Sequence, residues 1–358
     1  MSLTAREIAL AIVPKISGSL SMLGSSMILK DILSDQEERS NTYRRLMSMI
    51  SAFDLVSSFS YFLSTWPIPQ GENKGWNSPY HYAAVGNATT CTAQGFGIQI
   101  GITTVLYNVM LSVYYVFMIR RNTGEKAVQG LEPYLLGIPL IIGLSLAVTP
   151  YLMNLYNNSN LWCWIAPDWS LCETMGLDNS ECFKRTNVFR WVFYYGPLWI
   201  SAGCIMGCLG RVWWTVRNKE EASTRWRVNG APTDNQYSRR VAQQAFSYAV
   251  IFAIVWLPYC IMDLTGIYFH PHDNGFWVML LVTFCQPLQG FLNFLIYRRH
   301  VVANVSTNAT RRMQLMFGNS TTALRSRIRG MASSDGVSRM DSHDSGIDQN
   351  PGLQAVEP

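Results

Sequence analysis

The chain has 358 residues, of which 49% are hydrophobic, 13% aromatic and only 14% charged, with a net charge of +5. Soluble domains carry roughly 25% charged residues, so this composition excludes an ordinary soluble domain and predicts an all-α integral membrane protein. The sequence contains no P-loop, GxSxG, GxGxxG, HExxH or CxxC motif. We therefore expect no enzyme activity, no cofactor, no metal site and no nucleic-acid partner.

Seven segments are long and apolar enough to cross a bilayer, which takes about 20 residues each. Small residues around Gly18 and Gly24 of the first segment would let helices approach closely in lipid. We expect a seven-helix transmembrane domain over residues 8–300, between a short extracellular segment 1–7 and a cytoplasmic tail 301–358. The predicted spans are Ile8–Leu29, Leu46–Trp66, Thr92–Ile119, Pro133–Tyr156, Val188–Val216, Val241–Phe269 and Phe276–Tyr297.

The positions of lysine and arginine predict the orientation of the bundle. Segments 30–45, 120–133 and 211–240 and the tail after 298 hold 22 of the 28 lysines and arginines. Because basic loops stay in the cytoplasm, we expect the N-terminus outside, the C-terminus inside and a multi-pass protein of the plasma membrane. The basic helix ends would contact lipid headgroups, and they could also face a partner protein. They include Arg120, Arg121, Arg239 and Arg240.

Four cysteines fall in segments predicted to lie outside, where disulfides form and persist. Cys91 opens the third span, and Cys163, Cys172 and Cys182 follow the fourth. Four cysteines allow three pairings. We favour Cys91–Cys163 with Cys172–Cys182, and the alternative is that one pair stays reduced.

Two outer sequons and the tail are candidate sites of modification. Asn87 and Asn157 could carry glycans, and Asn157 is the poorer candidate because it lies very close to the membrane. Residues 301–330 are basic and could lie on the inner leaflet as an amphipathic segment or remain solvated. Residues 331–358 are rich in Ser, Asp and Gly, which predicts disorder. Phosphorylated serines there could bind kinase or arrestin-like partners.

Asp54 is an ionisable residue in the middle of the second span. An acid at this depth is costly unless it faces the bundle interior and finds partners. Gln289 and Asn293 of the seventh span lie at a comparable depth. These residues predict a hydrogen-bonded polar hinge, with or without water or a cation, and the alternative is a static polar contact between helices.

Two prolines predict kinks in the sixth and seventh spans. Pro258 and Pro287 each remove a backbone hydrogen bond. Trp256 lies just before the first kink, on the side that a ligand pocket would occupy, and Tyr297 closes the seventh span. Prolines are also ordinary in membrane helices, so a purely structural role is the alternative.

Polar and aromatic residues gather near the predicted outer mouth. Arg190, Trp191, Asp263 and His270 could bind an anionic or polar ligand, or they could form an ordinary interfacial belt. Lys15 lies about two turns into the first span, and we expect it to extend outward rather than line a pocket.

Four pieces of sequence carry a resemblance over residues 8–300. They are SGSLSMLGSSMIL, ISAFDLVSSF, Cys91 with Trp162-Cys163-Trp164, and QPLQGFLNFLIY. With the predicted topology they resemble seven-helix G-protein-coupled receptors, and the cyclic-AMP-receptor-like group of protists and related lineages (class E) in particular. The third span ends YYVFMIRRN, without the Asp/Glu-Arg-Tyr triplet of rhodopsin-like receptors. The seventh span lacks Asn-Pro-x-x-Tyr and the lysine that would hold retinal.

The resemblance implies a cell-surface receptor that binds an extracellular ligand and activates a heterotrimeric G protein by rearranging helices six and seven. It does not identify the ligand. The main alternative is a seven-helix transporter or channel for a small polar solute, which would need a continuous polar path. By position the resemblance assigns the bridge to Cys91 and Cys163, the helix-two acid to Asp54, the helix-six switch to Trp256 and Pro258, and the helix-seven end to Asn293 and Tyr297.

Overall fold

The computed structural model describes residues 5–34, 41–70, 82–121, 128, 130–225, 235–265 and 276–299. All of them belong to the unit Met1–His300. The described residues contain seven helical segments long and apolar enough to cross a membrane, so the chain is a mainly helical membrane protein, as the sequence predicted. The predictions made for the tail 301–358 and for His270 lie outside the described residues.

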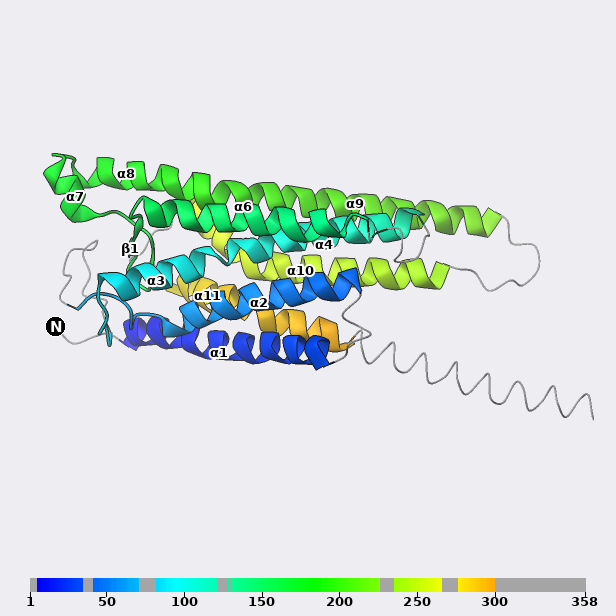
Figure 1. Cartoon of the computed structure of the whole chain (residues 1–358), viewed down its shortest axis with the longest axis horizontal. Coiled ribbons are helices and arrows are strands. Elements are labelled where there is room, and N and C mark those ends of the chain that lie inside the picture. Colours follow the sequence, from blue (N-terminus) through cyan, green and yellow to red (C-terminus); the bar gives the residue numbers. More distant parts are fainter. Residues whose placement is uncertain are drawn as a thin grey trace, which may run out of the picture. The chain divides into compact units, whose positions relative to one another are not determined.

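The first two helices, α1 (Ala5–Ser34) and α2 (Thr42–Leu63), pack along each other (Figure 1). Helix α1 begins at Ala5, three residues before the predicted span Ile8–Leu29. Asn41 caps α2, because its Oδ1 accepts a hydrogen bond from the backbone nitrogen of Tyr43 at 2.9 Å.

The third span consists of two helices, α3 (Ala88–Gln99) and α4 (Ile102–Arg121), which are interrupted at Ile100 and Gly101. Helix α4 contacts α2, α6, α9 and α10 and therefore lies at the centre of the bundle. The fourth span is α6 (Glu132–Leu152).

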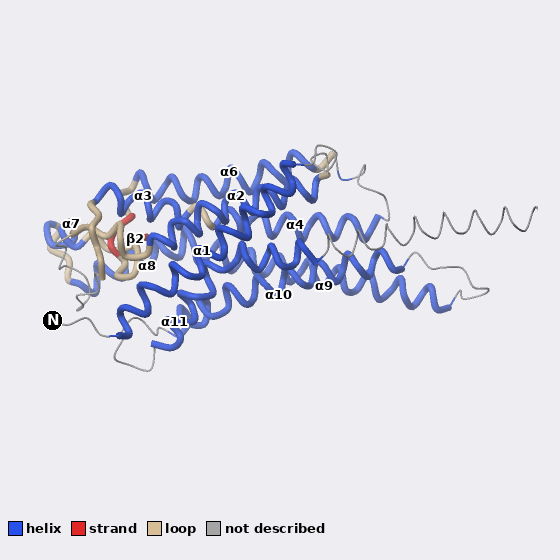
Figure 2. The backbone as a smooth tube through the Cα atoms, turned by 90° about the horizontal axis from the view of Figure 1, so that it is seen from below, coloured by secondary structure: helices blue, strands red, loops and turns tan. Residues whose placement is uncertain are grey.

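The prediction that the fourth span reaches Tyr156 is wrong, because the chain turns back after α6. Asn154 has a φ of 53°, in the left-handed region that ends the helix. Strand β1 (Tyr156–Asn158) then pairs with β2 (Cys163–Ile165) in an antiparallel hairpin, with Asn157 opposite Trp164. This hairpin and the short helix α7 (Trp169–Thr174) lie at one end of the bundle, which we call the hairpin end (Figure 2).

The fifth span is the longest continuous helix of the described chain. Helix α8 (Asn179–Arg190) passes through a π-helical turn, η2 (Trp191–Tyr195), into α9 (Gly196–Arg225). It extends beyond the predicted range Val188–Val216 at both ends. The π turn lies three residues into the predicted range, where an extra residue shifts the faces of the helix.

The last two spans pack against each other and against α1 and α4. Helix α10 (Asn235–Thr265) continues through Pro258, and its predicted end at Phe269 lies outside the described residues. Helix α11 (Phe276–Cys285) leads into a 3-10 turn, η3 (Gln286–Leu288), after which the chain is helical to residue 299. The predicted break at Pro287 is therefore present as this turn.

Candidate functional site

Two disulfides fix the hairpin end. Cys163 of β2 is bonded to Cys91 of α3, with their Cα atoms 5.2 Å apart, and the pair packs against buried Ile68. Cys172 of α7 is bonded to Cys182 of α8, with a Cα separation of 5.9 Å. Both favoured pairings are present in the structure.

Gln94 of α3 ties the hairpin to α2 through backbone atoms. Its Oε1 accepts from the backbone nitrogen of Cys163 at 2.8 Å, and its Nε2 donates to the carbonyls of Ser60 and Ser64 at 3.0 and 2.7 Å. The side chain is buried, and these bonds satisfy its amide. Gln94 is not among the residues predicted from the sequence, although an amide inside an apolar span signals a buried polar contact.

Gln99, also missed, joins the hairpin to the fourth and fifth spans. Its Oε1 accepts from the indole nitrogen of Trp164 at 2.8 Å. Its Nε2 donates to the carbonyls of Phe193 in η2 and Leu146 in α6, at 2.9 and 3.3 Å. A single buried side chain therefore connects β2, α6 and the π turn.

Tyr156 of β1 connects the hairpin to α3 and α6. Its hydroxyl donates to the carbonyl of Ala147 at 2.7 Å, and burial raises the pKa of the phenol, which therefore stays neutral. A Cβ on Gly95 would lie 2.8 Å from the Cβ of Tyr156, so glycine is needed for this close approach.

A cavity of about 110 Å³ lies beneath the hairpin. One water takes up about 10–15 Å³ of such a cavity, so it has room for several waters or a small organic molecule. Its walls come from the hairpin, α7, α8, η2, α10 and α11. They are mainly apolar, and their aromatic residues are Trp162, Trp164, Trp169, Phe183, Tyr195 and Tyr259.

Arg190 is the predicted mouth residue that lines this cavity. It is only 8% exposed, and its Nε donates to the carbonyl of Ile165 at 2.7 Å. Its guanidinium carbon lies 5.5 Å from the ring centroid of Trp164 and 5.7 Å from that of Phe183. Trp191, in contrast, does not line the cavity: it is 40% exposed and packs against Tyr195. Asp263 lies in α10, and its side chain is outside the described part.

Tyr194 of the π turn connects the cavity wall to the middle of the bundle. Its ring packs edge-on against Trp164 at 5.0 Å and against Tyr259 at 6.0 Å, measured between centroids. On its other side it contacts Trp256 at 6.1 Å, and its hydroxyl accepts from Nε2 of Gln286 at 3.3 Å. Trp164 and Tyr259, which line the cavity, therefore contact Tyr194, which lines the polar core.

The polar core is a second, much smaller cavity of about 10 Å³, enough for roughly one water. Asp54, Trp256, Gln286 and Gln289 line it, and Asp54 is only 5% exposed. Nδ2 of Asn293 donates to Oδ2 of Asp54 at 3.1 Å, as the sequence predicted. Gln289 shares this cavity with Asp54.

Two buried polar atoms of residues in the polar core lack a hydrogen-bond partner within the described residues. They are Nε1 of Trp256, a donor, and Oε1 of Gln286, an acceptor. Unpaired buried polar atoms are costly, so a rearrangement that pairs them would release free energy. The residue predicted as the helix-six switch, Trp256, is therefore one of the least satisfied groups of the core.

Serines of α1 and α2 form hydrogen bonds with backbone groups of the seventh span where Pro287 interrupts the helix. Pro287 cannot donate to the carbonyl of Thr283, and the Ser17 hydroxyl approaches that carbonyl at 3.5 Å. Oγ of Ser21 accepts from the backbone nitrogen of Gly290 at 2.9 Å, and the Ser58 hydroxyl donates to Ser21 at the same distance. The small residues of α1 thus supply hydrogen bonds as well as close packing.

Lys15 caps the end of α2 and lines neither the cavity beneath the hairpin nor the polar core. Its Nζ donates to the carbonyls of Phe62 and Leu63 at 3.3 and 3.0 Å and lies 3.6 Å from the ring centroid of Trp66. A cation at a helix C-terminus is favourable, so its place is structural.

The end of the bundle opposite the hairpin contains a group of aromatic rings that we call the tyrosine cluster: Tyr43, Tyr114, Tyr115 and Tyr248. The hydroxyls of Tyr43 and Tyr248 lie 2.9 Å apart, and Nε2 of Gln244 donates to Tyr43 at 2.8 Å. The Tyr43 ring lies 6.4 Å from the rings of Tyr114 and Tyr115. The cluster therefore holds α10 against α2 and α4.

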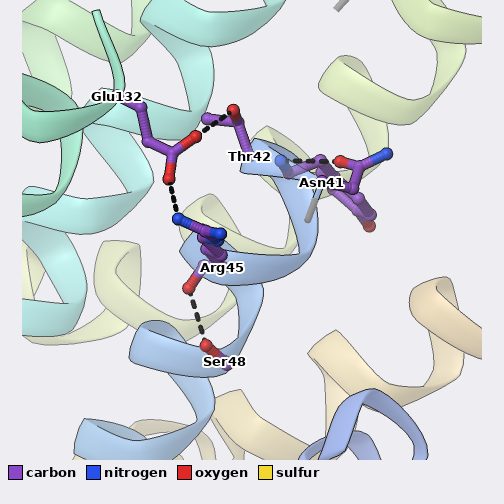
Figure 3. Close-up of polar contacts among 6 residues, drawn as sticks. Asn41, Thr42, Arg45, Ser48 and Glu132 are labelled. Carbon is purple, nitrogen blue, oxygen red and sulfur yellow. Dashed lines mark hydrogen bonds and ion pairs between the residues drawn. The ribbon is translucent and has the colours of Figure 1, made fainter. Parts of the chain in front are cut away.

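Two further contacts lie at this opposite end. Buried Tyr297 accepts from Nη1 of Arg44 at 3.3 Å. Glu132, the first residue of α6, accepts from the Thr42 hydroxyl at 2.8 Å and forms an ion pair with Arg45 (Figure 3). These contacts join the starts of α2 and α6 and the end of the seventh span.

The predicted basic residues belong to helices at this opposite end. Arg239 is exposed on α10. The side chains of Arg120, Arg121 and Arg240 lie outside the described part of the structure, although their backbones are helical.

The two sequons differ in structure. Asn87 is exposed and caps α3, where its Oδ1 accepts from the backbone nitrogen of Thr90 at 3.0 Å, and its Nδ2 stays available. In contrast, Nδ2 of Asn157 donates to the carbonyls of Asn154 and Ala166, both at 3.2 Å. A glycan on Asn157 would disrupt these bonds, so the folded hairpin disfavours that site.

No model of a known protein family matches the chain, and a search of curated proteins finds no match either.

Proposed function

We propose that the chain is a cell-surface G-protein-coupled receptor of seven transmembrane helices. The observation that carries this proposal is the cavity beneath the hairpin, whose wall residues Trp164 and Tyr259 contact Tyr194 of the polar core around Asp54. A ligand in the cavity contacts Tyr259 of α10 and Tyr195 of η2 directly. Its binding therefore biases the position of α10, on which the tyrosine cluster also acts.

The proposed orientation has the hairpin end outside and the tyrosine cluster in the cytoplasm. Two disulfides at the hairpin end suit an oxidising compartment. The basic helix ends suit the inner face of the plasma membrane and provide a cationic surface for a heterotrimeric G protein. In this orientation the C-terminus is cytoplasmic.

The proposal is tested by guanine-nucleotide exchange on co-expressed G-protein α subunits while extracellular ligands are screened. We expect at least one α subunit to exchange nucleotide faster when its ligand is present. Exchange that never depends on the chain, across all α-subunit classes and a broad ligand set, would argue against a receptor of this kind.

Asp54→Asn tests the role of the polar core within this function. The substitution keeps the shape of the side chain but replaces the carboxyl group, which accepts a hydrogen bond from Asn293, with an amide. We expect altered signalling with delivery to the cell surface largely retained. A variant that matches wild type in both signalling and thermal stability would show that the polar core is not a hinge.

The alternative is a transporter or channel for a small polar solute, in which the polar core would be the solute site inside the membrane. Bulky aromatic side chains separate this core from the outer cavity: Tyr194 and Trp256 contact each other, and Tyr195 accepts a hydrogen bond from Tyr259 at 3.2 Å. We therefore expect purified protein in liposomes to pass neither ions nor solutes. Robust uptake would favour the transporter.

A further inference from the structure

We infer that the cavity beneath the hairpin takes a small organic anion, a carboxylate attached to an aromatic body. This inference rests on the proposed receptor function and adds to it the chemical class of the ligand. It begins from Arg190, which alone among the described residues lining the cavity carries a charge.

Arg190 is buried, only 8% exposed, and no carboxylate of the described residues lies within ion-pair distance of it. Its one hydrogen bond, from Nε to the carbonyl of Ile165, leaves the remaining N–H donors of the guanidinium unpaired. An anion that enters the cavity replaces water at these donors and forms charge-assisted hydrogen bonds with them.

A carboxylate fits the donors that are left. Its two oxygens accept side-by-side N–H bonds from a guanidinium. Asn158 of β1 also lines the cavity, and its Nδ2 is buried with no partner within the described residues. A group that only accepts hydrogen bonds therefore matches both unpaired donors.

The rest of the cavity wall favours an aromatic body. Rings of Trp162, Trp169 and Tyr259 and the thioether of Met262 provide apolar contact area. A cationic ligand is disfavoured, although aromatic walls often bind ammonium groups. Arg190 would repel it, and the guanidinium already lies over the rings of Trp164 and Phe183.

The test measures thermal unfolding of the full chain, purified in detergent, without any G protein. The probes are phenylacetate, cinnamate and naphthylacetate, each beside its neutral amide, together with phenethylammonium. We expect the acids to raise the unfolding temperature at concentrations at least about tenfold below those of the amides, as charge-assisted hydrogen bonds require. Phenethylammonium should give no shift.

Two arginine variants localise the effect. Arg190→Gln should abolish the preference for acid over amide, whereas Arg185→Gln, an exposed arginine of the neighbouring helix turn, should retain it. If Arg190→Gln fails to fold, Arg190→Lys keeps the charge and should keep the preference with weaker binding.

The inference is overturned by equal shifts with acid and amide, by a shift with phenethylammonium, or by an unchanged preference in Arg190→Gln. Because this assay contains no G protein, its failure leaves the nucleotide-exchange result untouched. Conversely, acid binding would keep the anion site even if no α-subunit class and no ligand in the broad set gave nucleotide exchange, the outcome that argues against the receptor.

Discussion

The two ends of the bundle are held together by different kinds of bond. At the hairpin end, two disulfides link elements covalently, and the amides of Gln94 and Gln99 bond to backbone atoms of other elements. At the opposite end, the contacts between Tyr43 and Tyr248 and between Arg45 and Glu132 run from side chain to side chain. A covalent bridge stays closed when helices shift, whereas a contact between two side chains breaks when either side chain rotates. The hairpin end is therefore suited to keep a cavity in shape, and the opposite end to open.

The largest effect should come from removing the disulfide Cys91–Cys163. It closes a segment of 72 residues, and the Cys172–Cys182 pair closes one of 10. Loop-closure entropy gives about 4 kcal/mol for the first and about 3 kcal/mol for the second. We expect the double variant Cys91→Ser/Cys163→Ser to lose most of its surface delivery and to unfold at a much lower temperature.

The matched control for this variant is Cys172→Ser/Cys182→Ser, which should retain more of both properties. If both double variants lost stability equally, the two disulfides would contribute equally to the stability of the protein. The hairpin would then not depend specifically on its covalent link to α3.

Gln94→Leu should have the second largest effect. It leaves the carbonyls of Ser60 and Ser64 and the nitrogen of Cys163 without their partner in a buried place. We expect a loss of about 2–3 kcal/mol in the free energy of unfolding, measured by thermal unfolding of the purified protein. Gln70→Leu, at an exposed glutamine of the same end, is the control and should change little. A near-neutral Gln94→Leu would mean that the disulfide and the other contacts of the hairpin hold it without Gln94.

Tyr248→Phe should have the smallest effect on stability and a visible one on signalling. It removes one hydroxyl contact with Tyr43, which contributes about 1 kcal/mol. Under the proposed function, this loss shifts the closed–open equilibrium of α10, and about 1 kcal/mol corresponds to a roughly fivefold higher basal rate of nucleotide exchange.

Tyr134→Phe is the control for the tyrosine cluster, since Tyr134 is 64% exposed at the start of α6. It should leave the basal rate unchanged. A basal rate that is equally raised by both substitutions, or by neither, would remove the tyrosine cluster from the proposed opening movement.

Features that depend on local composition could be predicted from the sequence. The seven spans follow from apolar length, and the contact between Asp54 and Asn293 follows from their depth in two spans. The hairpin could not be predicted, because Leu155 and Tyr156 continue the apolar run of α6 until Asn154 turns the chain. An apolar run in the sequence indicates that a segment is buried, but it does not show whether the segment is a helix or a short strand.

Contacts between distant segments were also missed. The tyrosine cluster joins residues of α2, α4 and α10, and no local pattern links their positions in the chain. Gln94 and Gln99 were passed over because an amide in a span shows that a partner exists without showing which one. Arg190 was found, since a lone charge near the mouth is conspicuous, but its lack of a counterion needed three-dimensional neighbours.

The π turn at Trp191–Tyr195 has a consequence for comparing this chain with others. Its wider winding places one additional residue in the fifth span and brings Arg190 and Tyr195, five residues apart in the chain, to the same cavity. A homologous protein with a regular α-helix here would align only with a single-residue gap inside the membrane. An alignment without this gap would assign lipid-facing positions of the fifth span to the interior of the bundle. Distant relatives would then score poorly in the segment that joins the cavity to the polar core, and a search would overlook them.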